Sequence, residues 1–150
     1  MALLDLADRN WPFLNRAFGA HTALYRATRG VVGHRLPGLP PFLLLDHVDA
    51  KSSIERSSPL VYVEDDKNLV IVASKGGFPK HPAWFHNLRA NPETTVQVGT
   101  DRRHVRARIA TAAERERLWP KAVKTWAGYD DYQARTERKI PLVILEPRIG

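Results

Sequence analysis

Short apolar segments joined by short polar links are the feature of this 150-residue sequence that most restricts its fold. The clearest pair, residues 59–64 (PLVYVE) and 68–74 (NLVIVAS), is separated only by the polar residues 65–67. Strands joined by so short a link pair antiparallel, because a parallel pair needs a crossover of about a dozen residues or more. Residues 94–99 and 103–110 form a second such pair around a glycine-containing turn over 99–102. The sequence therefore predicts antiparallel hairpins.

Two further segments complete the predicted sheet. Residues 41–48 (PFLLLDHV) and 141–146 (PLVILE) are rich in large apolar side chains and have the length of buried strands. Closing these strands into a barrel removes the unpaired edges that an open sheet would expose. We therefore predict an α+β, mainly β fold: a small antiparallel β-barrel with helices on its flanks.

Several segments carry the apolar spacing or the end signals of helices. Thr111 and Glu114 form a capping box, in which the hydroxyl and the carboxylate satisfy backbone amides at a helix start. Pro82 suits the first turn of another helix, since proline has no amide hydrogen to lose there. The predicted helices cover residues 12–28, 82–91, 111–126 and 129–138.

The length suits one domain. We predict a single domain over 1–150, with an N-terminal helix and connector over 1–36 and a barrel core over 40–147. No window approaches the ~20 apolar residues that span a bilayer, and the N-terminus lacks a secretory signal pattern, which predicts a cytoplasmic protein. The aromatic and basic residues of 12–28 make peripheral membrane contact one reading of that helix. Packing on the domain's own sheet is the other.

Cysteine is absent, which excludes disulfides, cysteine-based metal sites and a thiol nucleophile. None of the six histidines forms the i, i+4 pair with an intervening Glu that helical zinc sites use, and no Asp/Glu cluster accompanies them, so no metal is expected. The net charge of +7 favours an anionic partner: nucleic acid, a membrane or a phosphorylated small molecule. A basic run over 102–108 would suit a phosphate backbone, but no nucleic-acid reading motif accompanies it, and nucleic-acid binding is not predicted.

Residues 73–77 (ASKGG) are a first candidate ligand-binding segment, because they follow a predicted strand. The two glycines allow close backbone approach or positive φ, Ser74 can donate a hydrogen bond, and Lys75 supplies positive charge. The spacing differs from a P-loop, so an ordinary Lys-Gly-Gly turn is the alternative.

Residues 49–58 (DAKSSIERSS) are a second candidate segment. Their hydroxyls, backbone amides and the cations Lys51 and Arg56 suit a phosphate group, and a solvated surface loop is the alternative. This segment and 73–77 flank the same predicted hairpin, whose geometry allows both to lie at one end. This geometry would allow a joint site for an anion and a flat ring.

Three aromatic residues, Trp126, Tyr129 and Tyr132, recur at a spacing of three. Side chains at that spacing share one helix face. They either wall a pocket for a flat substrate or pack in the core.

The segment ASKGGFPKHPAWFHNLRANPE, residues 73–93, resembles the deazaflavin-dependent nitroreductase family of mycobacteria and other actinobacteria. The family pattern is A-S-K/N-G-G, a short variable stretch, and P-x-W-[YF]-x-N-L-[KR]-A-N-P. The resemblance extends over about 40–147, including PLVYVEDDKNLVIVA and the closing Glu-Pro. Members reduce their substrates with reduced coenzyme F420, and their fold is a split β-barrel that in related proteins binds flavin mononucleotide (FMN).

The resemblance implies a set of site residues. The cofactor-binding residues would be Lys51, Ser52, Arg56, Ser58, Pro59, Ala73, Ser74, Lys75, Gly76, Gly77, Pro82, Trp84 and Asn87. The first three would hold the phosphate and acidic tail of the cofactor. Trp126, Tyr129 and Tyr132 would form the substrate pocket, and Ser74, Tyr129 and Tyr132 would be catalytic.

The implied activity is hydride transfer from reduced F420 to a small electron-poor acceptor, such as a quinone, a nitroaromatic or an activated C=C bond. The family loop T-x-G-R-K-S-G is changed here to Val48-Asp49-Ala50-Lys51-Ser52-Ser53, so both glycines and one arginine are missing and an acid has entered. The loss of one cation should weaken phosphate binding unless Arg56 compensates for it. An FMN-binding oxidoreductase is therefore one alternative, and a non-enzymatic basic binding module is another. Monomer and homodimer are both compatible with the sequence.

Overall fold

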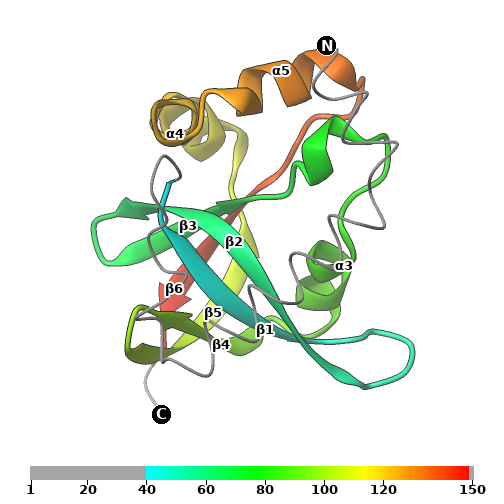
Figure 1. Cartoon of the computed structure of the whole chain (residues 1–150), viewed down its shortest axis with the longest axis vertical. Helices are drawn as coiled ribbons and strands as arrows, with labels where there is room; N and C mark the ends of the chain where they lie inside the picture. Colours follow the sequence, from blue (N-terminus) through cyan, green and yellow to red (C-terminus); the bar gives the residue numbers. More distant parts are fainter. Residues whose placement is uncertain (1–39, 149–150) are drawn as a thin grey trace.

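The computed structural model describes residues 40–148, which form a closed six-stranded antiparallel barrel (Figure 1). The order of strands around the barrel is β1-β2-β3-β6-β5-β4. The strands are β1 (Phe42–Val48), β2 (Glu55–Asp65), β3 (Asn68–Val72), β4 (Glu93–Val98), β5 (Asp101–Ile109) and β6 (Leu142–Pro147). The predicted mainly β barrel is confirmed. Closure comes from the pairing of β1 with β4 and of β3 with β6.

Helices cover two parts of the barrel surface. They are the short 3-10 helix η1 (Lys75–Gly77), α3 (Ala83–Ala90), α4 (Ala112–Thr125) and α5 (Gly128–Arg135). In Figure 1, α4 and α5 lie across the top and α3 lies at the right, near the β1–β2 hairpin. The helix predicted over 12–28 and the connector fall outside the described residues. Within 40–148, no helix is long and apolar enough to cross a membrane.

The β1–β2 hairpin is longer than the sequence indicated. Strand β2 begins at Glu55, which pairs with Val48, so the predicted loop over 49–58 shrinks to a turn over 49–54. The strand continues through polar residues because it is exposed there: Ser57 donates to the Asp46 carboxylate across the hairpin at 2.7 Å. The first residues of β2 are polar and show no alternation of apolar side chains. For this reason the sequence predicted a loop there.

The other boundary shifts are smaller. The β4–β5 link consists only of Gly99 and Thr100, because Val98 pairs directly with Asp101. Strand β3 ends at Val72 and α5 ends at Arg135, each a few residues before its predicted end. The capping box at α4 is present as predicted: the Glu114 amide donates to Thr111 Oγ1, and the Thr111 amide donates to Glu114 Oε1.

The continuous apolar runs of β3 and β6 are explained by burial on both faces. Ile71 and Leu145 point into the barrel, where they meet side chains of α3 such as Phe85. Their neighbours Val70 and Ile144 belong to a second core on the outside, beneath α4 and α5. A strand that is covered on both sides needs apolar residues at every position, as seen here.

Candidate functional site

The segment after β3 turns sharply through three residues with positive φ. The φ angles of Lys75, Gly76 and Gly77 are 44°, 62° and 80°. A Cβ on Gly77 would lie 2.6 Å from the backbone oxygen of Tyr132 in α5, whereas a Cβ on Gly76 would meet nothing within 4 Å. The second glycine is thus required by the close approach of α5. The first borders open space, where a ligand could approach the backbone.

Arg138 holds this segment in place. Its guanidinium donates to the carbonyl oxygens of Ala73 (3.0 Å), Ser74 (2.7 Å) and Phe78 (2.8 Å), and to Nδ1 of His81 (3.0 Å). Burial lowers the pKa of Arg138 from its ordinary value. One side chain between α5 and β6 therefore fixes the backbone over 73–81. The sequence singled out no role for this residue, since a lone arginine near a strand carries no local signal.

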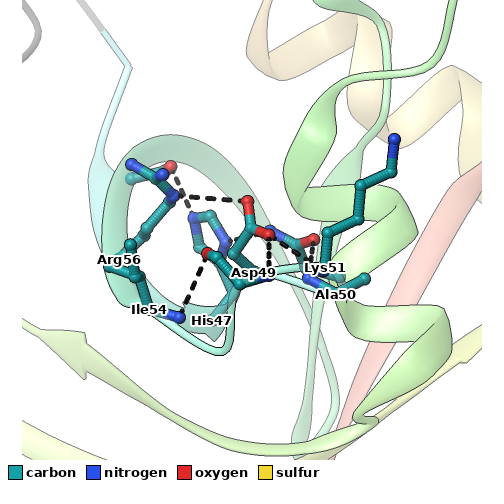
Figure 2. A network of polar contacts seen from close by, with 9 residues as sticks. His47, Asp49, Ala50, Lys51, Ile54 and Arg56 are labelled. Carbon is teal, nitrogen blue, oxygen red and sulfur yellow. Dashed lines mark hydrogen bonds and ion pairs between the residues drawn. The ribbon is translucent and has the colours of Figure 1, made fainter.

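The second candidate segment, the β1–β2 turn, is organised around Asp49 (Figure 2). Asp49 Oδ1 accepts hydrogen bonds from the amides of Lys51 (2.9 Å) and Ser52 (2.8 Å), and Oδ2 lies 3.6 Å from Arg56 Nε. These contacts lower the pKa of Asp49, and the hydrogen bond from the Ser52 amide makes the largest contribution. Lys51, Ser52 and Arg56 are exposed. Asp49, the acid that departs from the family pattern, therefore accepts the hydrogen bonds of two amides in the predicted phosphate loop.

A buried hydrogen-bonded chain connects this turn to α3. Asn87 Oδ1 accepts from the Ala50 amide at 3.0 Å, and Asn87 Nδ2 lies 2.9 Å from His47 Nδ1. Because the amide nitrogen is a donor, His47 Nδ1 accepts, and the proton on Nε2 is directed at Ser58 Oγ, 2.9 Å away. These hydrogen bonds place one proton on the His47 ring, so the imidazole is neutral. His47 was not predicted as a site residue, although a histidine inside an apolar run is a usable signal.

The burial of His47 predicts a pH dependence of stability. Burial, followed by the charge of Arg56, lowers the pKa of His47 below its ordinary value of 6.5. The folded protein then resists a proton that the unfolded chain accepts. The resulting stability is complete above about pH 6.5 and is lost as the pH falls toward the folded pKa, by at most about 1.4 kcal/mol per pH unit.

We therefore expect urea unfolding at pH 7.5 and 5.5 to give a smaller difference in His47→Gln than in the unchanged protein. His104, which is exposed on β5, provides the control: His104→Gln should keep the full difference. If His47→Gln loses as much stability at pH 5.5 as the unchanged protein, the neutral state of buried His47 is not a source of the pH dependence.

The two candidate segments lie along one side of the barrel, with α3 and the residues before it between them. Strand β2 is longer than β3. Its pairing with β3 begins at Tyr62, opposite Ile71, whereas its first residue, Glu55, adjoins the turn at 49–54. Asn87 of α3 reaches this turn, and His81, just before α3, reaches Arg138. In Figure 1 the β1–β2 hairpin extends to the lower right, and α5 lies at the top. The two segments therefore lie at different places along this side of the barrel.

The aromatic residues of α5 and the segment before it lie next to the glycine segment. Tyr129 is 5% exposed and packs in the outer core. Burial, with a smaller contribution from Tyr132, raises its pKa. Tyr132 and Trp126 are half-buried, and Trp126 Nε1 donates to the Tyr132 hydroxyl at 3.3 Å. Of the three, Tyr129 is a core residue here and the other two are partly accessible.

The remaining predicted residues differ in exposure. Ser58, Pro59, Lys75 and Gly76 are half-buried, and Ala73, Ser74, Gly77, Pro82, Trp84 and Asn87 are buried. Trp84 packs in the barrel core. A shallow groove of about 170 Å³ between α3 and β5, lined by Phe85, Arg89 and Ile109 among others, contains none of the predicted site residues.

The basic strand β5 is neutralised by carboxylates. Arg102 pairs with Asp46, Arg103 with Asp101, Arg106 with Glu93, and Arg108 with Glu114 and Glu146. Arg108 also lowers the pKa of Glu114 to about 2. The arginines therefore do not form a bare cationic surface. Among residues 40–148, no group of His, Asp and Glu side chains could hold a metal ion.

The closed barrel, with a glycine turn beside aromatic residues of α5, has the fold of a solved reductase that depends on reduced F420. A solved structure described as an F420-H2 dependent reductase (FDR-A) is 42% identical, with a TM-score of 0.66, over 71% of this chain and 94% of that one. A second, described as a domain-swapped dimer, is 38% identical, with a TM-score of 0.68, over 90% and 99%.

The family model for F420H(2)-dependent quinone reductase matches residues 17–147. A protein named F420H(2)-dependent quinone reductase from Mycobacterium tuberculosis (strain ATCC 25618 / H37Rv) is 45% identical over 131 residues, covering 85% of this chain and 88% of that protein. The chain belongs to the F420H(2)-dependent quinone reductase family. The interpretation as an oxidoreductase that uses reduced coenzyme F420 is therefore confirmed.

Proposed function

We propose that this chain reduces a quinone with reduced F420, and that the glycine segment and the β1–β2 turn hold the cofactor. The arrangement at η1 carries the proposal: Lys75 is half-buried beside Gly76, whose Cβ position is open, and Tyr132 packs against Gly77. Ser74 and Lys75 supply donors and charge for the ring and its ribityl chain. Lys51, Ser52 and Arg56 supply exposed donors and charge for the phosphate and acidic tail.

The buried members of the predicted set have a supporting role in this proposal. Ala73, Pro82 and Trp84 pack behind the surface that faces the cofactor, and Asn87 positions the Ala50 amide. Half-buried Ser58 and Pro59 continue that surface along β2. The residues fit an anionic ring-bearing cofactor because Lys51, Arg56 and Lys75 supply positive charge and Gly76 leaves its backbone open to a flat ring.

The reaction needs a hydride and a proton. The reduced deazaflavin supplies the hydride when bound, and we assign the proton to the Tyr132 hydroxyl. Its oxygen accepts from Trp126 Nε1, so its own proton is directed elsewhere. Tyr129 is the weaker candidate, since burial raises its pKa and so makes it a poorer acid. Contact of residues 12–28 with a membrane, and the choice between monomer and homodimer, stay predictions.

The direct test is titration of the purified protein with F420, followed by fluorescence. Menadione is then added to the reduced complex under anaerobic conditions. We expect saturable binding and menadione-dependent oxidation of the cofactor. Binding of FMN in place of F420 would favour the flavin alternative. Salt-sensitive binding to DNA or anionic vesicles without uptake of either cofactor would favour the basic binding module.

Lys75→Ala should weaken F420 binding about tenfold or more, because a hydrogen bond to a charged group contributes about 1.5–3 kcal/mol. The fold should be little affected, since the Lys75 ammonium makes only a 5.8 Å contact with the Phe78 ring. Lys80→Ala removes the same charge from a neighbouring exposed position and should leave the affinity unchanged. Equal dissociation constants for the two variants would remove Lys75 from the site.

A further inference from the structure

We propose that Asp49 is a built-in competitor for the anionic part of the cofactor and sets how tightly this chain holds it. The inference rests on the proposed function, in which the β1–β2 turn receives the phosphate and acidic tail. It concerns a residue at which the chain departs from the family loop pattern.

The Asp49 carboxylate lies where a bound anion would be expected. Its Oδ1 accepts from two successive amides, those of Lys51 and Ser52, and its Oδ2 lies 3.6 Å from the guanidinium of Arg56 (Figure 2). Successive amides beside a cation are the usual components of an anion-binding site in a turn. Here the protein's own side chain fills it.

The turn leaves an external anion few free donors. Each amide carries one hydrogen, and those of Lys51 and Ser52 are directed at Asp49. The third amide of the run, that of Ala50, is directed at Asn87 Oδ1. A phosphate must displace the carboxylate or bind beside it against its negative charge. Both routes weaken binding relative to a turn without this charge.

The displacement is physically accessible. The side chains of Asp49 and Arg56 are 28% and 51% exposed, so neither is locked in the interior. Lys51 is exposed, and in Figure 2 its ammonium points away from Asp49. The cations can therefore engage an incoming anion while the carboxylate swings out. The competition is specific to ligands that carry a negative charge at this end.

Asp49→Asn removes the negative charge but keeps the structure of the loop, because an asparagine oxygen can still accept the two amide hydrogen bonds. We expect this variant to bind F420 about three- to tenfold more tightly, with little change for the deazaflavin riboside that lacks phosphate and glutamates. Asp66→Asn is the control: Asp66 is an exposed acid on the β2–β3 turn, and removal of its charge should leave both affinities unchanged.

Unchanged or weaker F420 binding by Asp49→Asn would overturn the inference while leaving the proposed function intact. Failure of the unchanged protein to bind either deazaflavin would instead overturn the proposed function. A second measurement is independent of the cofactor: inorganic phosphate is titrated while the amide NMR signals of residues 51 and 52 are followed. Those signals should shift at lower phosphate concentration in a folded Asp49→Asn protein than in the unchanged one, and equal titration curves would contradict the competition.

Discussion

Arg138→Leu is expected to lower the free energy of unfolding by about 3 kcal/mol or more and to abolish measurable F420 binding. The change removes the donor to the carbonyl oxygens of Ala73, Ser74 and Phe78 at once. The Ser74 oxygen keeps the hydrogen bond from the Gly77 amide, but the partly buried segment loses its donors from Arg138 and the positive-φ turn loses its support. The melting temperature should fall by roughly 10 °C.

Two variants separate this role from a general loss of charge. Arg138→Lys keeps the charge but lacks the planar fork of donors, so it should recover only part of the stability. Arg103→Gln removes an arginine whose ion pair is exposed and should cost at most about 1 kcal/mol. Equal melting temperatures for Arg138→Leu and Arg103→Gln would show that the guanidinium does not hold the segment.

Gly77→Ala should be the most damaging single-methyl change in the cofactor segment, at about 3 kcal/mol. A Cβ at this position would lie 2.6 Å from the Tyr132 carbonyl oxygen and 3.0 Å from its Cα, both backbone atoms that cannot rotate away. The φ of 80° adds the cost of a left-handed alanine. Relief requires α5 to move, which should also displace Tyr132 and lower the turnover of quinone.

Gly76→Ala provides the comparison within the same turn. Its φ of 62° carries a similar backbone cost, but no atom lies within 4 Å of the added methyl. We expect a loss of about 1 kcal/mol, and a larger relative effect on F420 binding if the cofactor approaches here. Chemical denaturation of both variants measures the difference. A Gly77→Ala protein as stable as Gly76→Ala would show that α5 adjusts without cost.

Much of the fold was predictable because its signals are local. Links of three residues or fewer between apolar segments predicted antiparallel hairpins, and the capping box predicted the start of α4. The glycine pair after β3 correctly indicated a turn that needs positive φ. The polar start of β2 was missed, since its cross-strand bonds replace the apolar alternation that marks a strand.

The residues that organise the candidate site could not be read in the same way. Ser74 and Arg138 are 64 residues apart, and His47 and Asn87 are 40 apart. Their hydrogen bonds depend on the direction of each side chain after the barrel has closed. The sequence showed that an acid had entered the loop, but only the structure shows that its carboxylate accepts hydrogen bonds from two amides of the turn.

The sequence by itself therefore determined the hairpins, the barrel and the family, because short links, apolar periods and a long contiguous motif act within a few residues of one another. Only the tertiary structure decided that Tyr129 packs in the core and Tyr132 stays partly accessible, and that Arg138 secures the glycine segment. Such outcomes depend on which distant surfaces meet and exclude water, and that is settled when the strands close and the helices pack.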